Sequence, residues 1–172
     1  LWGGSDWNDS IDACGILGKG ESLWLAEATV KFCGEFVELL NRLGKNKEAD
    51  EIQRKIDVMK NAILTHGWDK DHFIYGFNDY GERVGSYDTE QGQMYLNPQT
   101  WAILADIVTG EEADKLMEFV ENNLQCEYGY IQQLPSYSKG DDKIGRMTYF
   151  QKGCYENGSV YNHGCAFKLV AD

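Results

Sequence analysis

The sequence lacks several features that would place it in common classes of protein. It has no run of about 18 apolar residues, so no transmembrane helix is expected. Lys and Arg number 16 against 28 Asp and Glu, which gives a formal net charge of -12. This excess of negative charge argues against nucleic acids and anionic membranes as partners.

Motifs for nucleotide binding and serine hydrolysis are also missing: there is no Walker A loop, no Rossmann fingerprint and no G-x-S-x-G elbow. His66, Asp69, Asp71 and His72 are residue types that bind metals, but their spacing matches no standard zinc pattern. A calcium loop is not favoured either, because Phe73 occupies the next ligand position. We interpret this segment as a solvated turn, and we expect no metal and no cofactor.

The cysteines do not form a recognisable disulfide framework. There are five, an odd number, and they are widely spaced and include no C-x-x-C pair: Cys14, Cys33, Cys126, Cys154 and Cys165. This pattern is typical of free thiols in a reducing compartment, and we expect a cytoplasmic location. The sequence has no initiating Met and its ends fall within motif-like segments, so we expect a fragment of a larger protein.

The residues that are present predict one domain with a substantial core. The chain has 172 residues, about the length of one domain, and 42% of them are hydrophobic. Apolar side chains recur at helical spacing over 21–43 and 47–66, and Gly44 between them is typical of a helix end. We therefore expect a helical hairpin. The apolar face predicted for its first helix consists of Trp24, Ala28, Phe32, Phe36, Leu39 and Leu43.

The middle of the chain is predicted to be largely irregular. Phe73, Tyr75 and Phe77 alternate with other residues, which favours a short strand or hairpin. Asn97 and Pro98 are the residue types preferred at an N-cap and at the first helical position. We therefore expect a helix to begin there.

The last third is predicted to contain two further helices around a long connection. One helix follows Gly110, and the other begins near Ser159 or Tyr161 and continues past Asp172. The connection, 125–159, is rich in Tyr and Gly, and loops of that length in a domain are usually functional. Repeated helical hairpins joined by long loops favour an α/α toroid or solenoid.

A segment near the start, Gly4–Ser10, is the first candidate site. It places two carboxyl groups, an amide and a large aromatic ring in succession at Asp6, Trp7, Asn8 and Asp9. A Trp face can stack on a sugar, and a nearby carboxyl group can donate a proton to a glycosidic oxygen. Burial beside the ring would supply the raised pKa that a general acid needs. The alternative is that these Asp residues form turns or caps.

A second polar cluster lies at the other end of the chain. Its most informative residues are Glu156, Asn157, Tyr161, Asn162 and His163. A His near a helix start can bind phosphate, although a single His is often only structural. The two clusters form one site only if the fold brings the chain ends together.

Several motifs occur together in the order and at about the separations of one known family. They are Asp6-Trp7-Asn8-Asp9, Gly85-Ser86, Leu96-Asn97-Pro98-Gln99-Thr100-Trp101 and Gly153-Cys154-Tyr155-Glu156-Asn157-Gly158-Ser159-Val160-Tyr161-Asn162-His163. With these motifs, the chain resembles the cellobiose and chitobiose phosphorylases of glycoside hydrolase family 94 over essentially its whole length. The resemblance implies an all-α fold. Residues 1–172 would be a partial (α/α)6 barrel with a short β-hairpin and long loops, one catalytic domain truncated at both ends.

The resemblance also implies an activity and roles for individual residues. The activity is reversible, inverting phosphorolysis of a β-linked glucosyl or N-acetylglucosaminyl disaccharide to an α-sugar 1-phosphate. Phosphate is already a nucleophile, so one carboxylic acid suffices, together with donors that hold phosphate. The implied residues are Asp9 as general acid, Trp7 and Glu156 at the sugar, His163 at phosphate, and Asp6, Asn8 and Gln99 as support.

Two departures from the family pattern keep alternatives open. The upstream arginines and the downstream Thr-Gly pair of the family's phosphate site are not in this chain, and Ser159–Phe167 differs from the best-known cellobiose enzymes. An inverting glycoside hydrolase on the same barrel and a non-catalytic carbohydrate-binding helical module remain alternatives. The expected partners are a disaccharide, phosphate, the remainder of the parent chain and a second copy. An incomplete toroid would leave apolar faces exposed.

Overall fold

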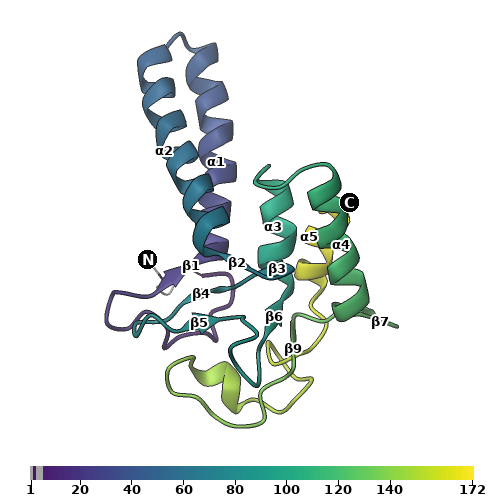
Figure 1. The fold of residues 1–172 in the computed structure, drawn as a ribbon. Helices are drawn as coiled ribbons and strands as arrows, with labels where there is room; N and C mark the ends of the chain where they lie inside the picture. Colours follow the sequence, from purple (N-terminus) through teal and green to yellow (C-terminus); the bar gives the residue numbers. More distant parts are fainter. Residues whose placement is uncertain (1, 3–5) are drawn as a thin grey trace.

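In a computed structural model, which describes Trp2 and residues 6–172, the helices gather at one end and the strands and long loops at the other (Figure 1). The flanking Gly4 and Ser5 of the first candidate segment lie outside the described residues. Helix α1 packs against α2 and α3, and α3 also packs against α4 and α5. The helices are α1 (Leu23–Arg42), α2 (Asn46–His66), α3 (Leu96–Leu104), α4 (Glu111–Leu124) and α5 (Asn162–Ala171), with a short 3-10 helix η1 (Arg146–Tyr149).

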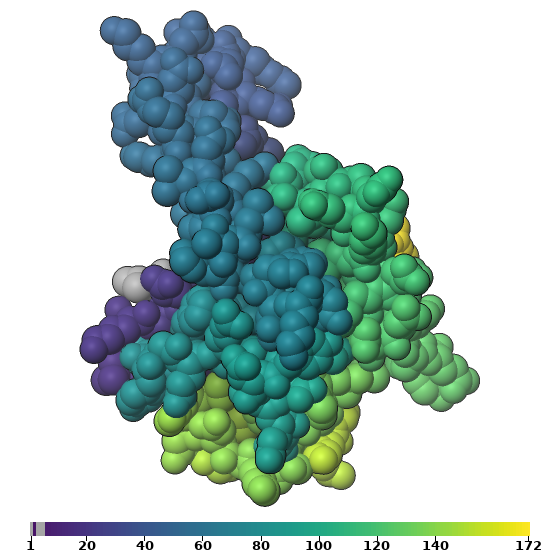
Figure 2. Space-filling model, viewed as in Figure 1, coloured from purple at the N-terminus to yellow at the C-terminus, as the bar shows by residue number. Residues whose placement is uncertain are grey.

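The predicted hairpin of α1 and α2 is confirmed, but only the first part of the predicted apolar face of α1 is covered, and most of its other residues are exposed. Phe32 and Phe36, from the predicted face, are 58% and 47% exposed. The buried residues of α1 are Leu23, Glu27, Ala28, Val30 and Leu40. Two of the predicted apolar residues, Trp24 and Phe32, contact Trp101 of α3. Helix α3 has only nine residues, so the rest of that face extends beyond it with the projecting hairpin (Figure 2).

Short antiparallel strands occupy the other end. The predicted all-α fold with one short β-hairpin is therefore confirmed only in part, because several strand pairs accompany the helices. The single strand expected around Phe73 and Phe77 is divided into two short strands that pair with different partners. Phe73 belongs to one and Phe77 to the other, and Tyr75 lies buried between them. The pairs are β1 (Glu21–Ser22) with β4 (Gly76–Phe77), β4 with β5 (Arg83–Val84), β2 (Trp68–Asp69) with β3 (His72–Phe73), β6 (Met94–Tyr95) with β9 (Gln133–Leu134), and β7 (Gln125–Cys126) with β8 (Gly129–Tyr130).

Helix α3 begins two residues earlier than predicted, because Tyr95 and not Asn97 is its N-cap. Asn97 is buried, and its Oδ1 accepts a hydrogen bond from Gln132 Nε2 at 2.8 Å. Gln99 is buried too: its Oε1 accepts from the Phe73 N–H at 2.8 Å, and its Nε2 donates to the carbonyls of Phe73 and Tyr95. The two side-chain amides therefore attach the central helix, α3, to β3, to β6 and to the segment between β8 and β9.

The segment around Asp69 and His72 is not the solvated turn that we predicted. Both side chains are buried. His72 Nε2 lies 3.1 Å from the Gly85 carbonyl and 3.0 Å from the Gln93 carbonyl, and Asp69 accepts from Ser86 Oγ at 2.8 Å. These contacts hold the β2–β3 turn against the following loop. Within the described residues, no group of three or more His, Cys, Asp or Glu side chains could hold a metal ion.

Apart from the core between the helices, a separate cluster of buried residues lies beneath the loops. It joins the N-terminal segment to the long connection before α5, which places the two candidate segments on one side of the molecule. Its members are Trp2, Ile11, Cys14, Tyr75, Val84, Tyr95, Tyr137, Ile144 and Met147.

The five cysteines are all free in the structure. Among the helices of the described chain, none is both long enough and apolar enough to cross a membrane.

Candidate functional site

The two candidate segments meet at Trp7 and His163. The Trp7 Nε1–H donates a hydrogen bond to His163 Nδ1 at 2.8 Å, although 156 positions separate the two residues. Because Nδ1 accepts this bond, the proton of a neutral imidazole lies on Nε2. His163 is exposed at the second position of α5, and its Nε2–H donates no hydrogen bond to any of the described residues, so it can donate to a ligand.

Aromatic contacts extend from this pair into the helices. The Trp7 ring lies edge-on to Tyr161 at 5.7 Å between centroids and to Phe167 at 6.4 Å. Phe167 in turn lies 4.4 Å from His163 and 5.2 Å from Trp101 of α3. The indole thus packs against the start of α5, and Phe167 connects it to α3.

Asp6 anchors the segment that carries Trp7. It is buried, and it accepts hydrogen bonds from Tyr75 Oη at 2.6 Å, from the Asn8 N–H at 3.0 Å and from the Ser22 hydroxyl. Burial raises the pKa of Asp6, and these three hydrogen bonds oppose that rise. Ser22 is also the N-cap of α1, so this carboxyl group connects the segment to the start of the helix.

Asn8 is the second anchor, and burial alternates along the segment. Asn8 Oδ1 accepts from Ser10 Oγ at 2.7 Å, and Asn8 Nδ2 lies 3.5 Å from Met147 Sδ. Asp6 and Asn8 are buried, whereas Trp7 is half-buried and Asp9 is exposed. The two inward side chains hold the backbone, and the other two are left available for a ligand.

The Asp9 side chain is 74% exposed, so the predicted burial beside Trp7 is not found. The physical reason is the alternation: Asp9 follows the buried Asn8 and turns outward. Its charged neighbour is Arg146 of η1, whose Nη2 lies 4.0 Å from Asp9 Oδ2 and donates to the Asp9 carbonyl oxygen at 3.0 Å.

Glu156 lies in a turn that is fixed by its neighbour Asn157. The buried Asn157 Oδ1 accepts from the Tyr137 N–H at 2.7 Å, and its Nδ2 donates to the carbonyls of Tyr137 and Phe150. Gly158 has a φ of 81°, and a Cβ at this position would lie 2.0 Å from Ser136 Oγ. The turn therefore requires glycine after Asn157, and Glu156 itself is left half-buried at its edge.

Tyr161 lies in the electric field of both candidate carboxylates. Burial raises the pKa of Tyr161, and the charge of Glu156, a hydrogen bond to Glu156 and the charge of Asp9 raise it further. The phenol therefore keeps its proton and can donate a hydrogen bond. Since its ring also packs against Trp7, Tyr161 connects the acidic groups to the indole.

The structure thus brings together Trp7, Asp9, Glu156 and His163, with Asp6 and Asn8 beneath them. The hydrogen bonds of Gln99 all end on the main chain of Phe73 and Tyr95, so it supports the core instead of this surface.

From the sequence, Arg146 was not identified, and Tyr161 was placed in the second cluster without an assigned role. Arg146 belongs to no motif that we identified. Tyr161 lay inside one, and its place two residues before His163 was the available signal.

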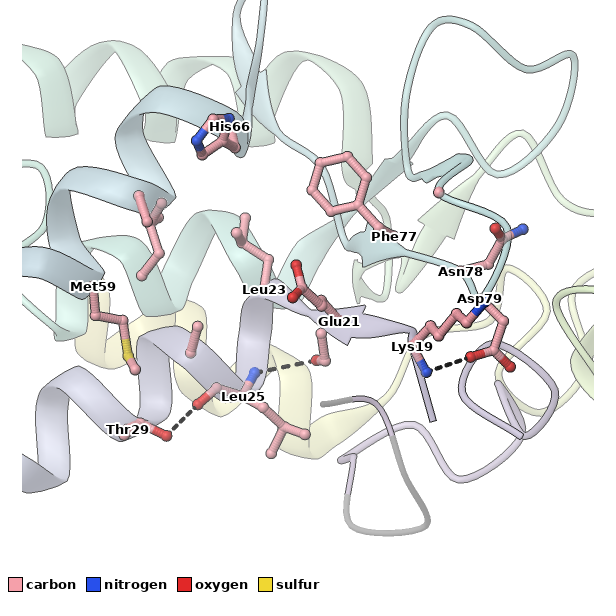
Figure 3. Close-up of a pocket in the computed structure, with 15 residues that line it drawn as sticks. Lys19, Glu21, Leu23, Leu25, Thr29, Met59, His66, Phe77, Asn78 and Asp79 are labelled. Atoms are coloured by element: carbon pink, nitrogen blue, oxygen red, sulfur yellow. Dashed lines mark hydrogen bonds between the residues drawn. The ribbon is translucent and has the colours of Figure 1, made fainter. Parts of the chain in front are cut away.

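A separate groove of about 900 Å³ opens between α1, α2 and the strands β1 and β4 (Figure 3). Leu23, Met59 and Phe77 line it together with the polar His66 and Asp79. Asp79 accepts hydrogen bonds from the Lys19 and Leu17 N–H groups, which fixes the loop at its edge. The groove does not include the Trp7–His163 surface.

Three known proteins are similar to this chain over 97–100% of its length. The chain is 39% identical over 168 residues to a solabiose phosphorylase of Paenibacillus borealis, covering 97% of this chain and 22% of that protein. It is 34% identical over 172 residues to a 3-O-beta-D-glucopyranosyl-beta-D-glucuronide phosphorylase of the same species, covering 100% of this chain and 22% of that protein. An N,N'-diacetylchitobiose phosphorylase of Vibrio proteolyticus is 29% identical over 170 residues, covering 98% of this chain and 21% of that protein.

The chain therefore spans 22% of the length of the first two of these relatives. The family model described as the catalytic domain of the Glycosyl hydrolase 94 superfamily matches residues 1–172. The chain accordingly belongs to the Glycosyl hydrolase 94 superfamily, because the model of that catalytic domain matches all 172 residues of this chain.

Proposed function

We propose that the whole protein is an inverting disaccharide phosphorylase that acts on a β-linked glucosyl or N-acetylglucosaminyl disaccharide. Family membership and the phosphorylase names of the similar proteins support this proposal. The observation that carries it is the Trp7–His163 hydrogen bond, because it sets a sugar-stacking ring beside a free imidazole donor.

In this reaction a phosphate oxygen attacks the anomeric carbon from the face opposite the glycosidic oxygen. The bond between that carbon and the glycosidic oxygen breaks, and the Asp9 proton passes to the leaving oxygen. The products are an α-sugar 1-phosphate and a monosaccharide. In the reverse direction, the Asp9 carboxylate takes the proton from the attacking hydroxyl. No second carboxylate is needed to activate a water molecule, because phosphate is the nucleophile.

The other residues have binding roles in this proposal. His163 donates from Nε2 to a phosphate oxygen, and Trp7 packs against the apolar face of the sugar. Glu156 accepts hydrogen bonds from sugar hydroxyls, with the protonated Tyr161 beside it as a donor. Inorganic phosphate is a co-substrate, and no metal or organic cofactor takes part.

Helices α1, α3 and α5 are proposed to be neighbouring inner helices of an (α/α)6 barrel, with α2 and α4 in the outer ring. The packing of α1 on α3 and of α3 on α5, with α2 against α1 and α4 against α3, supports this arrangement. The exposed Phe32 and Phe36 would then contact other helices of the whole protein, or a second copy. The same added segments would shield Asp9 from water. The free cysteines support a cytoplasmic location.

The decisive experiment offers the whole protein β-linked disaccharides with and without phosphate and detects α-sugar 1-phosphate by phosphorus NMR. We expect sugar 1-phosphate only when phosphate is present. Equal cleavage in the absence of phosphate would indicate a glycoside hydrolase, and sugar binding without turnover would indicate a binding module. Either result would overturn the proposal.

Asp9→Asn tests the assignment of the general acid. We expect it to lower kcat by about 10²–10⁴-fold, the range typical of general acid catalysis. Asp88→Asn is the matched control, because Asp88 is 73% exposed and lies 4.0 Å from Arg83 Nη1. Full activity in Asp9→Asn would exclude Asp9 as the acid.

A further inference from the structure

A distant loop holds the segment that carries Asp9. The Ala13 N–H donates to the Ile144 carbonyl at 3.2 Å, and the Met147 N–H donates to the Ser10 carbonyl at 3.0 Å. Between them, Gly145 has a φ of 124°, and a Cβ there would lie 2.2 Å from Asp12 Oδ1. The two backbones are therefore in close register on both sides of Arg146.

Arg146 completes this attachment with its main chain and its guanidinium group. Its N–H donates to Asp12 Oδ1 at 2.9 Å, and its Nε lies 3.6 Å from Asp12 Oδ2. Its Nη2 donates to the Asp9 carbonyl oxygen at 3.0 Å. One side chain thus spans the main chain at Asp9 and the carboxylate at Asp12.

The Asp9 carboxylate itself stays outside this hydrogen-bonded set. Its Oδ2 lies 4.0 Å from Arg146 Nη2, beyond hydrogen-bond distance. A hydrogen bond from the guanidinium group to the carboxylate would occupy the Asp9 oxygens. Here the guanidinium lies closer to the Asp12 carboxylate, at 3.6 Å, so the Asp9 oxygens are not occupied by a hydrogen bond from Arg146.

We propose that Arg146 is a positioning residue that holds the backbone of Asp9 and leaves the Asp9 carboxyl group free for proton transfer. This inference rests on the proposed phosphorolysis. Proton transfer requires the acid to lie within hydrogen-bond distance of the glycosidic oxygen, and a displacement of about 1 Å can cost about 10²-fold in rate. By holding the Asp9 backbone, Arg146 limits how far the exposed carboxyl group can be displaced.

Arg146→Gln and Arg146→Lys in the whole protein test the role, with Arg83→Gln as control. Arg83 is a suitable control because its Nη1 also lies 4.0 Å from an exposed carboxylate, that of Asp88. We expect Arg146→Gln to lower kcat by about 10- to 100-fold with little change in the KM for phosphate. Arg146→Lys should recover part of the loss, and Arg83→Gln should retain wild-type kcat.

A change of substrate separates positioning of the acid from general damage to the structure. A dinitrophenyl β-glycoside departs without protonation, so it needs no general acid. We expect the defect of Arg146→Gln to shrink strongly with this substrate. An equal defect with both substrates, or an unchanged kcat with the disaccharide, would overturn the proposal.

Amide hydrogen exchange over 9–13 provides a readout that does not depend on turnover. We expect faster exchange in Arg146→Gln than in the wild type or Arg83→Gln, because the hydrogen bond to the Asp9 carbonyl is lost. Unchanged exchange would overturn the positioning role, whatever the activity. Absence of sugar 1-phosphate from the wild type would instead overturn the proposed function, so the two failures are distinguishable.

Discussion

Trp7 and His163 are joined by a hydrogen bond of 2.8 Å from the indole nitrogen to the imidazole Nδ1. This bond connects the N-terminal segment to the start of α5. It also determines which nitrogen of a neutral imidazole carries the proton. A residue that is expected to border the sugar therefore controls the orientation of the residue that is expected to bind phosphate.

Trp7→Phe tests that coupling, because it removes the N–H donor and retains an aromatic ring. Without the bond, the His163 ring is free to rotate and to exchange tautomers. We therefore expect the KM for phosphate to rise by about tenfold in the whole protein, which corresponds to the loss of about one hydrogen bond. Steady-state kinetics at varied phosphate measure the change.

Trp68→Phe is the matched control for this variant. The Trp68 indole also donates a hydrogen bond, to the Lys70 carbonyl at 2.9 Å, but it does so far from His163 in the sequence and outside the candidate site. Its KM for phosphate should remain that of the wild type. An unchanged KM in Trp7→Phe would show that the indole does not act through His163.

Glu27 is predicted to make stability depend on pH. It is fully buried in α1 and has no hydrogen-bond partner among the described residues. Burial raises the pKa of Glu27 well above its ordinary value of 4.5. The folded state therefore binds this proton more tightly than the unfolded state. The resulting stability is fully present below pH 4.5 and is lost as pH rises toward the folded pKa, by about 1.4 kcal/mol per pH unit.

Glu27→Gln should remove this dependence, because an amide does not titrate. We expect the variant to gain stability relative to the wild type as pH is raised from 5 to 7, measured by urea unfolding at each pH. Glu35→Gln is the control, since Glu35 lies on the same helix but its side chain is 58% exposed. Parallel pH profiles for the wild type and Glu27→Gln would contradict the prediction.

Glu27 also explains why the orientation of α1 could not be predicted from the sequence. A periodicity argument places a glutamate on the solvated face, which selects the stripe that contains Phe32 and Phe36 as the core. In the structure, the short α3 covers only the first part of that stripe, and Glu27 is buried. The existence of the α1–α2 hairpin was predictable from local patterns. Which side of α1 is buried depends on the helices that pack against it.

In the candidate site, too, some features could be predicted from the sequence and others could not. Motif order was enough to predict that Trp7 and His163 belong to one site, and their hydrogen bond agrees with this. The approach of Arg146 to Asp9 was not predictable, because 137 positions separate the residues and no motif contains the arginine. The exposure of Asp9 follows from the burial of Asn8, which depends on the tertiary contact with Met147.

Gly158→Ala should disrupt the turn that presents Glu156. The residue has a φ of 81°, and an added Cβ would lie 2.0 Å from Ser136 Oγ. We expect a loss of about 2–4 kcal/mol in stability, from the left-handed backbone conformation and the steric clash together. Thermal unfolding of the whole protein and its affinity for the disaccharide measure the effect.

Gly153→Ala separates the two contributions in the same loop. Gly153 has a similar φ of 76°, but a Cβ there would meet nothing within 4 Å. This control should lose only the conformational part, about 1–2 kcal/mol, and should keep its affinity for the disaccharide. Equal losses in the two variants would show that the contact with Ser136 does not matter.

The exposed face of α1 is predicted to drive self-association of the 172-residue chain. Phe32, Phe36, Leu39 and Leu43 recur at helical spacing, and each is at least 47% exposed. Apolar side chains gathered on one helix face are typical of interaction surfaces. We expect sedimentation of this chain to show oligomers at micromolar concentration.

Phe36→Ser combined with Leu39→Ser should shift this chain toward the monomer, because the change removes the centre of the apolar stripe. Val58→Ser is the control: Val58 is 72% exposed on α2, and it lies outside the stripe. The helix should persist in both variants, since the substituted side chains contribute little to the core. A wild-type chain that sediments as a monomer at all concentrations would contradict the prediction. An oligomer that survives the double substitution would assign association to another surface.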